Sequence, residues 1–395
     1  MDKPDPDGLV TVAGQLLAEN KTTGAFSYYK KAANLYMESG SYFKVFEVFK
    51  IMTYIYKEQG KLGEMIQLVL ETARKLEDFK VFDVAARMYE NAGTLCYDLA
   101  DYENASAYYQ NASDLYLSLW EENRERDGSG DDARKFADDM RKLSGILLIK
   151  SAEATYHVLA RKDKSESLML EGIFRICALA EQVPSIETTL VLHMKRGNFL
   201  DARNMASNLA KAFKEANEKL HVTREFNVEL LSANVKSRVL HYQAEYLFIS
   251  YLITRKLEGE EKAAAIAKEV LSLLLESMGL MRGIFAKEHD REDIERYCFD
   301  GMLHAVISAL LKKKPEPVDF QDRLHGDIIR AINESAYYKI MVTIIGPGLK
   351  QAELALMDAN LGKLERMKGT LMKLIFAEGT GTRTGTGDNG TGMKN

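Results

Sequence analysis

Hydrophobic residues recur at steps of three and four along most of the first third of the chain. The runs FKVFEVFKIMTYIYKEQ and VAARMYENAGTLCYDLA show this most clearly, and they lie about forty residues apart. Their matching stripes are Phe49, Met52, Thr53 and Tyr56, then Tyr89, Ala92, Gly93 and Cys96. A spacing of three and four residues is the period of an amphipathic helix, so both runs are predicted to be helices with one buried face.

Turn signals separate these runs at intervals of about twenty residues. They are Gly40-Ser41-Tyr42, Gly60-Lys61-Leu62, Asp78-Phe79 and Ala100-Asp101-Tyr102. A glycine takes the left-handed backbone conformation that ends a helix, and a helix of twenty residues is about 30 Å long. One pair of such helices cannot bury both of its faces, so neighbouring pairs are expected to stack in a row.

Small and large side chains alternate within the predicted pairs. Tyr89-x-x-Ala92-Gly93-x-x-Cys96, followed by Ala105-x-x-x-Tyr109-x-x-Ala112, resembles the tetratricopeptide-repeat pattern, and Gly197-Asn198-Phe199-x-x-Ala202 repeats its turn. The period of about forty residues is longer than the usual ~34 residues of a tetratricopeptide repeat. Together with the Tyr-rich segment YYKKAANLY, it resembles the soluble NSF-attachment protein branch of that superfamily. The resemblance covers residues 20–118 well and 185–217 in part. It implies an all-α fold, a right-handed α-solenoid of antiparallel helical hairpins.

The chain is expected to divide into three regions. Residues 7–218 form the repeat region, 220–378 a C-terminal helical bundle, and 379–395 (GTGTRTGTGDNGTGMKN) a disordered tail, because Gly and Thr offer no apolar surface to bury. Only six prolines occur in 395 residues, and 7–183 and 185–314 contain none, as long helices require. Later helices are expected over Glu225 to Leu257, Ile328 to Ile345 and Lys350 to Phe376, among others.

Bulk properties narrow the function classes. A net charge of −5 argues against nucleic acid as a partner. Cys96, Cys177 and Cys298 lie far apart without CxxC spacing, which predicts buried small side chains in a reducing compartment. No apolar run approaches the ~20 residues of a membrane span, and the N-terminus lacks a secretory signal. We therefore expect a cytoplasmic protein without integral membrane association.

No catalytic, phosphate-binding or metal motif stands out. His241 and Glu245 lie four residues apart on one predicted helix, and Asp300 and His304 do the same. Either pair supplies two metal ligands, but a site needs three or four, so ordinary helical pairing is the favoured interpretation. We expect no metal, no cofactor and no enzymatic activity.

The repeat pattern instead predicts a partner-binding groove. If Gly93 occupies the small position of its helix, the groove residues are Arg87, Glu90, Thr94 and Tyr97, and one period earlier Glu47, Lys50, Tyr54 and Lys57. These side chains are polar or aromatic while their neighbours are apolar or small; ordinary solvated helix faces explain the pattern equally well. The expected function is a protein–protein scaffold that binds a partner helix or extended peptide. The alternatives are a regulatory sensor with a ligand pocket in the C-terminal helical region, and an enzyme whose site is assembled from distant helices.

Overall fold

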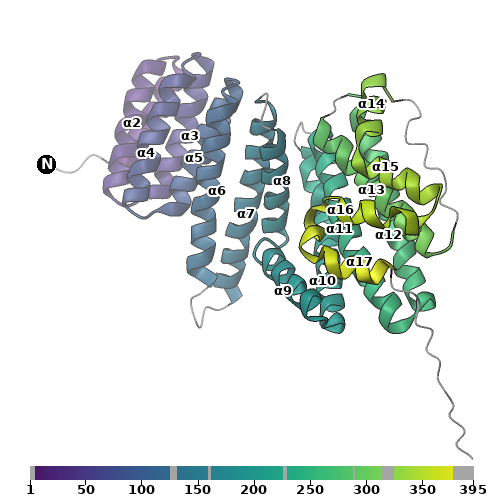
Figure 1. Cartoon of the computed structure of the whole chain (residues 1–395). Helices are drawn as coiled ribbons and strands as arrows, with labels where there is room; N and C mark the ends of the chain where they lie inside the picture. Colours follow the sequence, from purple (N-terminus) through teal and green to yellow (C-terminus); the bar gives the residue numbers. More distant parts are fainter. Residues whose placement is uncertain are drawn as a thin grey trace, which may run out of the picture. The chain divides into compact units, whose positions relative to one another are not determined.

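The computed structural model describes residues 5–124, 131–158, 162–225, 229–287, 290–313 and 324–376 (Figure 1). Within these ranges every regular element is a helix and no strand occurs, which confirms the predicted all-α class. The expected disordered tail, 379–395, lies outside the described residues. The chain forms two compact units: unit 1 takes its described residues from Met1–Gln182 and Glu215–Val235, and unit 2 from Val183–Lys214 and Lys236–Asn395. These units do not coincide with the expected ranges 7–218 and 220–378.

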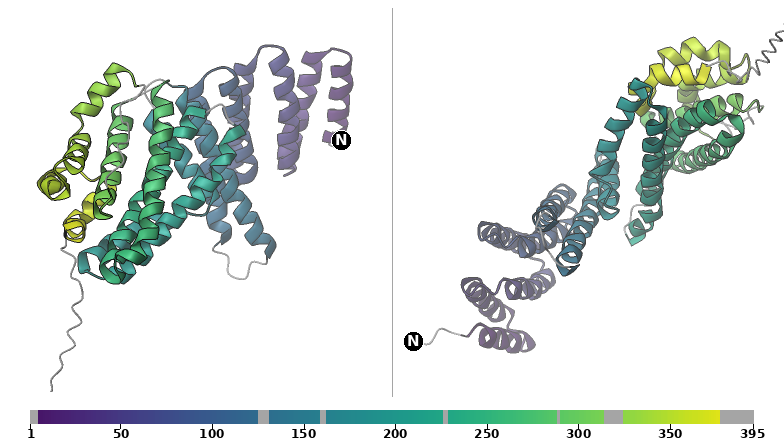
Figure 2. Two further views of the ribbon diagram at one scale, coloured as in Figure 1. Left: turned by 90° about the vertical axis from the view of Figure 1, so that its right-hand side faces the viewer. Right: turned by 90° about the horizontal axis from the view of Figure 1, so that it is seen from below.

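Unit 1 is a row of helices in which each helix packs against the next in sequence, and α3 also contacts α5. Figures 1 and 2 show the first helices of the row side by side. The helices are α1 (Pro6–Ala18), α2 (Thr22–Glu38), α3 (Tyr42–Glu58), α4 (Leu62–Asp78), α5 (Phe82–Asp98), α6 (Tyr102–Arg124), α7 (Asp131–Tyr156) and α8 (Lys162–Ile176). Sequential packing confirms the helical-repeat character predicted from the hydrophobic stripes.

The turn signals that recur about every twenty residues correspond to helix ends of one kind. One residue takes a left-handed conformation after each of the first five helices, with φ between 57° and 73°: Asn20, Gly40, Gly60, Lys80 and Ala100. The next amide N–H bonds back to a carbonyl five residues earlier, for example Ser41 N to Tyr36 O at 2.8 Å and Asp101 N to Cys96 O at 2.9 Å. These are Schellman motifs, which satisfy carbonyls that the ending helix leaves without partners.

Glycines set the closest approach between helices of unit 1. A β-carbon on Gly145 of α7 would lie 2.6 Å from the carbonyl oxygen of Gly172 of α8, and a β-carbon on Gly172 would lie equally close to the carbonyl oxygen of Gly145. The two backbones therefore touch at a point where only glycine fits. Arg141 of α7 is buried beside them, and its guanidinium donates to the carbonyls of Arg175 and Ile176 at the end of α8.

Unit 2 contains the remaining helices. All or most of each lies in this unit: α9 (Gln182–Arg196), α10 (Phe199–Lys219), α11 (Glu229–Glu258), α12 (Glu260–Phe285), α13 (Arg291–Leu310), α14 (Gly326–Glu334), α15 (Ala336–Ile345), α16 (Glu353–Asp358) and α17 (Lys368–Phe376), with 3-10 turns at Leu349–Ala352 and Gly362–Met367. The end of α10 from Glu215, the 3-10 turn Leu220–Glu225 and the start of α11 up to Val235 belong to unit 1. Helix α13 is the most deeply buried: most of its side chains are enclosed, and Asp290 caps its first turn by accepting from Asp293 N at 2.8 Å.

Two of the expected long helices are broken. The predicted helix from Ile328 to Ile345 is interrupted at Ser335, whose extended backbone separates α14 from α15. The predicted helix from Lys350 to Phe376 is instead two short helices and two 3-10 turns. Gly362 interrupts it with φ of 57°, a left-handed conformation that a regular helix cannot contain.

The structure also bears on the predictions for the three cysteines and for membrane spans. Cys96 and Cys298 are buried and Cys177 is half-buried, and all three are free thiols, so the predicted packing role is confirmed for the first two. Among the helices that the structure describes, none combines the length and the apolar character that crossing a membrane demands.

Candidate functional site

The eight predicted groove residues lie on two neighbouring helices of unit 1, α3 and α5. Glu47, Lys50, Tyr54 and Lys57 of α3 are all exposed, whereas Arg87, Glu90 and Tyr97 of α5 are half-buried and Thr94 is exposed. The two sets therefore differ in how far solvent or a partner can reach them.

The exposed face of α3 carries large apolar side chains between its charges. Tyr54 is 65% exposed, Phe43 54% and Ile51 37%. Because residues 43, 47, 50, 51 and 54 are spaced at three, four, seven and eight positions, they share one side of the helix. We call Phe43, Glu47, Lys50, Ile51 and Tyr54 the α3 stripe. The stripe combines apolar side chains with charges of both signs, and all five of its residues are exposed among the described residues.

The α5 residues are held by neighbouring helices. Glu90 accepts a hydrogen bond from Lys150 of α7 at 2.7 Å, and Tyr97 donates to Glu153 of the same helix at 2.9 Å. The Arg87 guanidinium lies 5.9 Å from the ring centroid of Phe43, a cation–π distance. These contacts fix the α5 side chains in place.

One predicted α3 residue is also held in this way. Lys57 pairs with Asp98 of α5 at 2.5 Å. Together with the α5 contacts, this pair leaves the α3 stripe as the more accessible part of the predicted surface.

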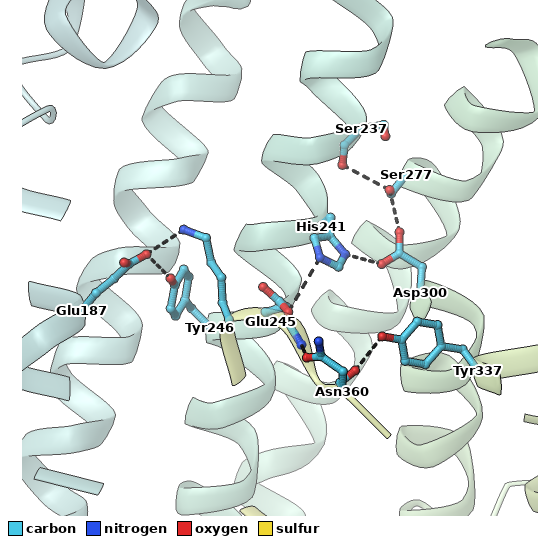
Figure 3. A network of polar contacts seen from close by, with 11 residues as sticks. Glu187, Ser237, His241, Glu245, Tyr246, Ser277, Asp300, Tyr337 and Asn360 are labelled. Carbon is cyan, nitrogen blue, oxygen red and sulfur yellow. Dashed lines mark hydrogen bonds and ion pairs between the residues drawn. The ribbon is translucent and has the colours of Figure 1, made fainter. Parts of the chain in front are cut away.

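A second candidate site lies in unit 2, where His241 of α11 meets Asp300 of α13 (Figure 3). The His241 Nδ1 lies 2.6 Å from Asp300 Oδ1. Ser277 of α12 completes the group: its hydroxyl lies 2.7 Å from Asp300 Oδ2 and 3.1 Å from the Ser237 carbonyl oxygen. Because an ionised carboxylate only accepts, Nδ1 carries a hydrogen and a neutral His241 presents its Nε2 lone pair.

On its other side, His241 faces Glu245, one turn later on α11. Glu245 Oε1 lies 3.7 Å from His241 Nε2, too far for a direct hydrogen bond. The Glu245 side chain is 1% exposed, and its second oxygen, Oε2, has no hydrogen-bond partner among the described residues. A buried carboxylate oxygen without a donor is unusual, because desolvation makes it costly.

Both groups line a cavity of about 330 Å³. We call it the His241 pocket; its walls are Arg238, His241, Tyr242, Glu245, Glu292, Glu295, Arg296, Phe299, Tyr337, Gly362 and Lys363. The aromatic walls contact one another: the rings of Phe299 and Tyr337 meet edge to face with centroids 5.1 Å apart. The size of the pocket lies in the range of small-ligand sites, and its lining combines three aromatic rings with seven ionisable side chains.

Lys363 and Tyr337 connect the pocket to its surroundings. Lys363 pairs with Glu187 of α9 at 2.8 Å, and its ammonium group lies 4.3 Å from the ring centroid of Tyr242. Tyr246 also donates to Glu187, so one carboxylate holds two side chains. Tyr337 donates to the carbonyl oxygen of Asn360 at 2.6 Å, which positions its ring at the edge of the pocket.

The electrostatics couple His241 to Glu245. Burial raises the pKa of Glu245 to about 7, against the attraction of His241 and Lys363. Burial alone would lower the pKa of His241, but the charges of Asp300 and Glu245 outweigh it and raise that pKa above its ordinary value. Near neutral pH the Glu245 carboxyl is therefore close to the midpoint of its titration.

The sequence predicted the members of this site only as separate helical pairs. His241 with Glu245 is such a pair, and Asp300 joins His241 from another helix, α13. Nothing in the local sequence pattern distinguishes Ser277 or Lys363, so the sequence predicts neither as a member of this site. Among the described residues, no three His, Cys, Asp or Glu side chains are placed to hold a metal ion.

No protein family and no curated protein matches the sequence.

Proposed function

We propose that the chain is a non-enzymatic, cytoplasmic scaffold that binds a helix or extended segment of a partner protein through the α3 stripe and the adjoining α5 residues. The observation that carries the proposal is the stripe itself. Phe43, Ile51 and Tyr54 expose apolar surface along one side of a helix, and Glu47 and Lys50 lie between them. Exposed aromatic side chains beside charges are common anchors in protein interfaces.

The held α5 residues support the proposal. Binding costs less conformational entropy when the side chains that receive the partner are already ordered. Glu90 and Tyr97 are ordered by Lys150 and Glu153 before any partner arrives. The mixed signs of charge on this surface favour a protein over nucleic acid.

The proposed architecture is a right-handed solenoid of antiparallel hairpins, similar to tetratricopeptide repeats and to the soluble NSF-attachment protein branch. What supports it is the twenty-residue period of the helix ends and the sequential packing of α1 to α8. The tyrosine-rich segment at residues 28–36 and the small positions of α5 and α6 are consistent with this branch.

Affinity capture with a matched pair of variants tests the scaffold function. Lys50→Glu/Tyr54→Ser alters the α3 stripe, and Lys75→Glu/Phe79→Ser makes the same two types of change at the end of α4, where Phe79 is 56% exposed. We expect partners recovered with the wild type to be kept by the α4 variant and lost by the stripe variant. Equal recovery with both variants would refute the assignment.

The His241 pocket makes a ligand-regulated sensor the second candidate function. Converging ionisable groups in a cavity favour a small-molecule site over a plain structural core. Glu245 supplies the specific observation, because its carboxylate is buried, lines the cavity and has an oxygen without a donor among the described residues. Saturable binding of a small molecule by the wild type, lost in Glu245→Gln, tests this function.

A further inference from the structure

We propose that the His241 pocket binds a small organic cation with a primary ammonium group, which donates hydrogen bonds to Glu245 and to Nε2 of His241. The inference deepens the second candidate function by naming its ligand class. It is independent of the α3 stripe, which lies in the other unit.

The first argument is the gap between two acceptors. His241 Nε2 and Glu245 Oε1 lie 3.7 Å apart, and neither can donate to the other when His241 is neutral and Glu245 is ionised. A single group with several N–H donors can contact both at ordinary hydrogen-bond lengths. An ammonium group has three donors and no acceptor, so it fits such a pair of acceptors.

The second argument is charge. The cations that line the pocket already have carboxylate partners: Arg238 with Glu292 at 3.2 Å, Arg296 with Asp293 at 2.9 Å, and Lys363 with Glu187 at 2.8 Å. Asp300 is matched to His241. Among the described residues, two lining carboxylates, Glu245 and Glu295, form no ion pair with a lysine or an arginine. Glu245 lies 3.7 Å from His241 Nε2, and Glu295 accepts from the Ser335 hydroxyl at 2.6 Å. A bound cation would give Glu245 and Glu295 a partner of opposite charge.

The third argument is the aromatic part of the lining. Tyr242, Phe299 and Tyr337 give the cavity apolar faces for a short hydrocarbon chain. The Lys363 ammonium, 4.3 Å from the Tyr242 ring centroid, shows that an amine on an alkyl chain is accommodated at this edge of the pocket. At about 330 Å³ the cavity holds more than an isolated water, which takes up about 30 Å³ in the liquid.

The pocket also predicts a proton balance. Binding needs Glu245 ionised and His241 neutral, and because the pKa of both groups is raised, that of Glu245 to about 7, protonation of either group competes with the ligand. The other charged groups that act on the pair are Asp300, Glu187, Lys363 and Arg296. Ammonium binding should therefore release up to one proton and should tighten as the pH rises from 6 to 8.

Isothermal titration calorimetry on the full chain tests the proposal with n-butylammonium chloride as the probe. We expect saturable binding, with weaker binding of tetramethylammonium, which has no N–H donor, and of n-butanol and butyrate, which lack the charge or reverse it. Titration in two buffers of different ionisation enthalpy should show the released proton.

Two variants separate the pocket from adventitious amine binding. Glu245→Gln should weaken n-butylammonium binding by about tenfold or more, as expected for a lost hydrogen bond to a charged group. Glu269→Gln, an exposed residue of α12, should leave it unchanged. Three results would each overturn the proposal: no saturable binding of n-butylammonium, equally tight binding of tetramethylammonium, or an affinity for n-butylammonium that Glu245→Gln leaves unchanged. If Glu245→Gln does not fold, the ranking of the four probes on the wild type decides alone.

Discussion

The ring of Tyr109 in α6 lies directly over the α-carbon of Gly93 in α5: a β-carbon at position 93 would come within 2.8 Å of two ring carbons. The Tyr109 hydroxyl donates to Thr94 at 3.2 Å, which holds the ring in this place. Gly93, which is predicted to occupy the small position of the repeat, must therefore be small because the Tyr109 ring packs against it.

Gly93→Leu should destabilise the protein by about 1–3 kcal/mol, because Tyr109 would have to leave its position or the helices would have to separate. Urea unfolding followed by circular dichroism measures the change. Gly63→Ala is the matched control: it lies in α4 with nothing within 4 Å of the added β-carbon, so it should be neutral or stabilise by up to about 1 kcal/mol. Equal effects of both changes would contradict the packing described.

Ala100→Gly should stabilise the protein by about 0.5–1 kcal/mol. Ala100 has φ of 57°, a conformation that costs an L-residue with a β-carbon about 1–2 kcal/mol and costs glycine almost nothing. The gain is reduced because glycine has more freedom in the unfolded chain. The reverse change, Gly60→Ala at φ of 67°, should destabilise by a similar amount although its surroundings are open. Thermal unfolding of both variants would show shifts of opposite sign.

The thiols should react slowly in the native protein. Burial raises the pKa of Cys96 and Cys177 to about 11 and that of Cys298 to about 12, so little thiolate exists at pH 8. With Ellman's reagent, we expect the half-buried Cys177 to react first and the other two to react only after denaturant is added. Rapid modification of all three without denaturant would be inconsistent with their burial.

Glu245→Gln should alter how stability depends on pH. A carboxyl whose pKa rises on folding stabilises the fold where it is protonated; this contribution is complete below the unfolded value of 4.5 and is lost as the pH rises through about 7. The amide does not titrate, so the variant should gain about 2–3 kcal/mol relative to the wild type between pH 5 and pH 8. Urea unfolding across this range measures the difference. A parallel pH profile for the two proteins would show that Glu245 does not carry the effect, and Glu269→Gln serves as the control.

The repeat was predictable because its determinants are local. The hydrophobic stripe of one helix and the turn that ends it are determined by about twenty consecutive residues. Accordingly, α3 and α5 begin and end close to where the stripes indicate. Lys80 and Ala100 make the same left-handed turn as Gly40 and Gly60, although neither is a glycine.

The His241 pocket was not predictable in the same way. His241 and Asp300 are 59 residues apart in sequence, and Glu187 and Lys363 are 176 apart. The approach of Gly145 to Gly172 likewise depends on how α7 and α8 cross, which no stripe specifies. Helical spacing pairs Asp300 with His304 and gives no sign of His241, because tertiary packing and not position on one helix brings His241 and Asp300 together.

The left-handed residue after each early helix has a consequence for how this chain can diverge. Asparagine, glycine, lysine and alanine all serve at that position, and the bonds that close each turn come from the backbone. Mutations can therefore change the amino-acid sequence of the turns while their backbone conformation is kept. Arrays built in this way can drift beyond recognition by sequence comparison and still keep the same spacing of helices.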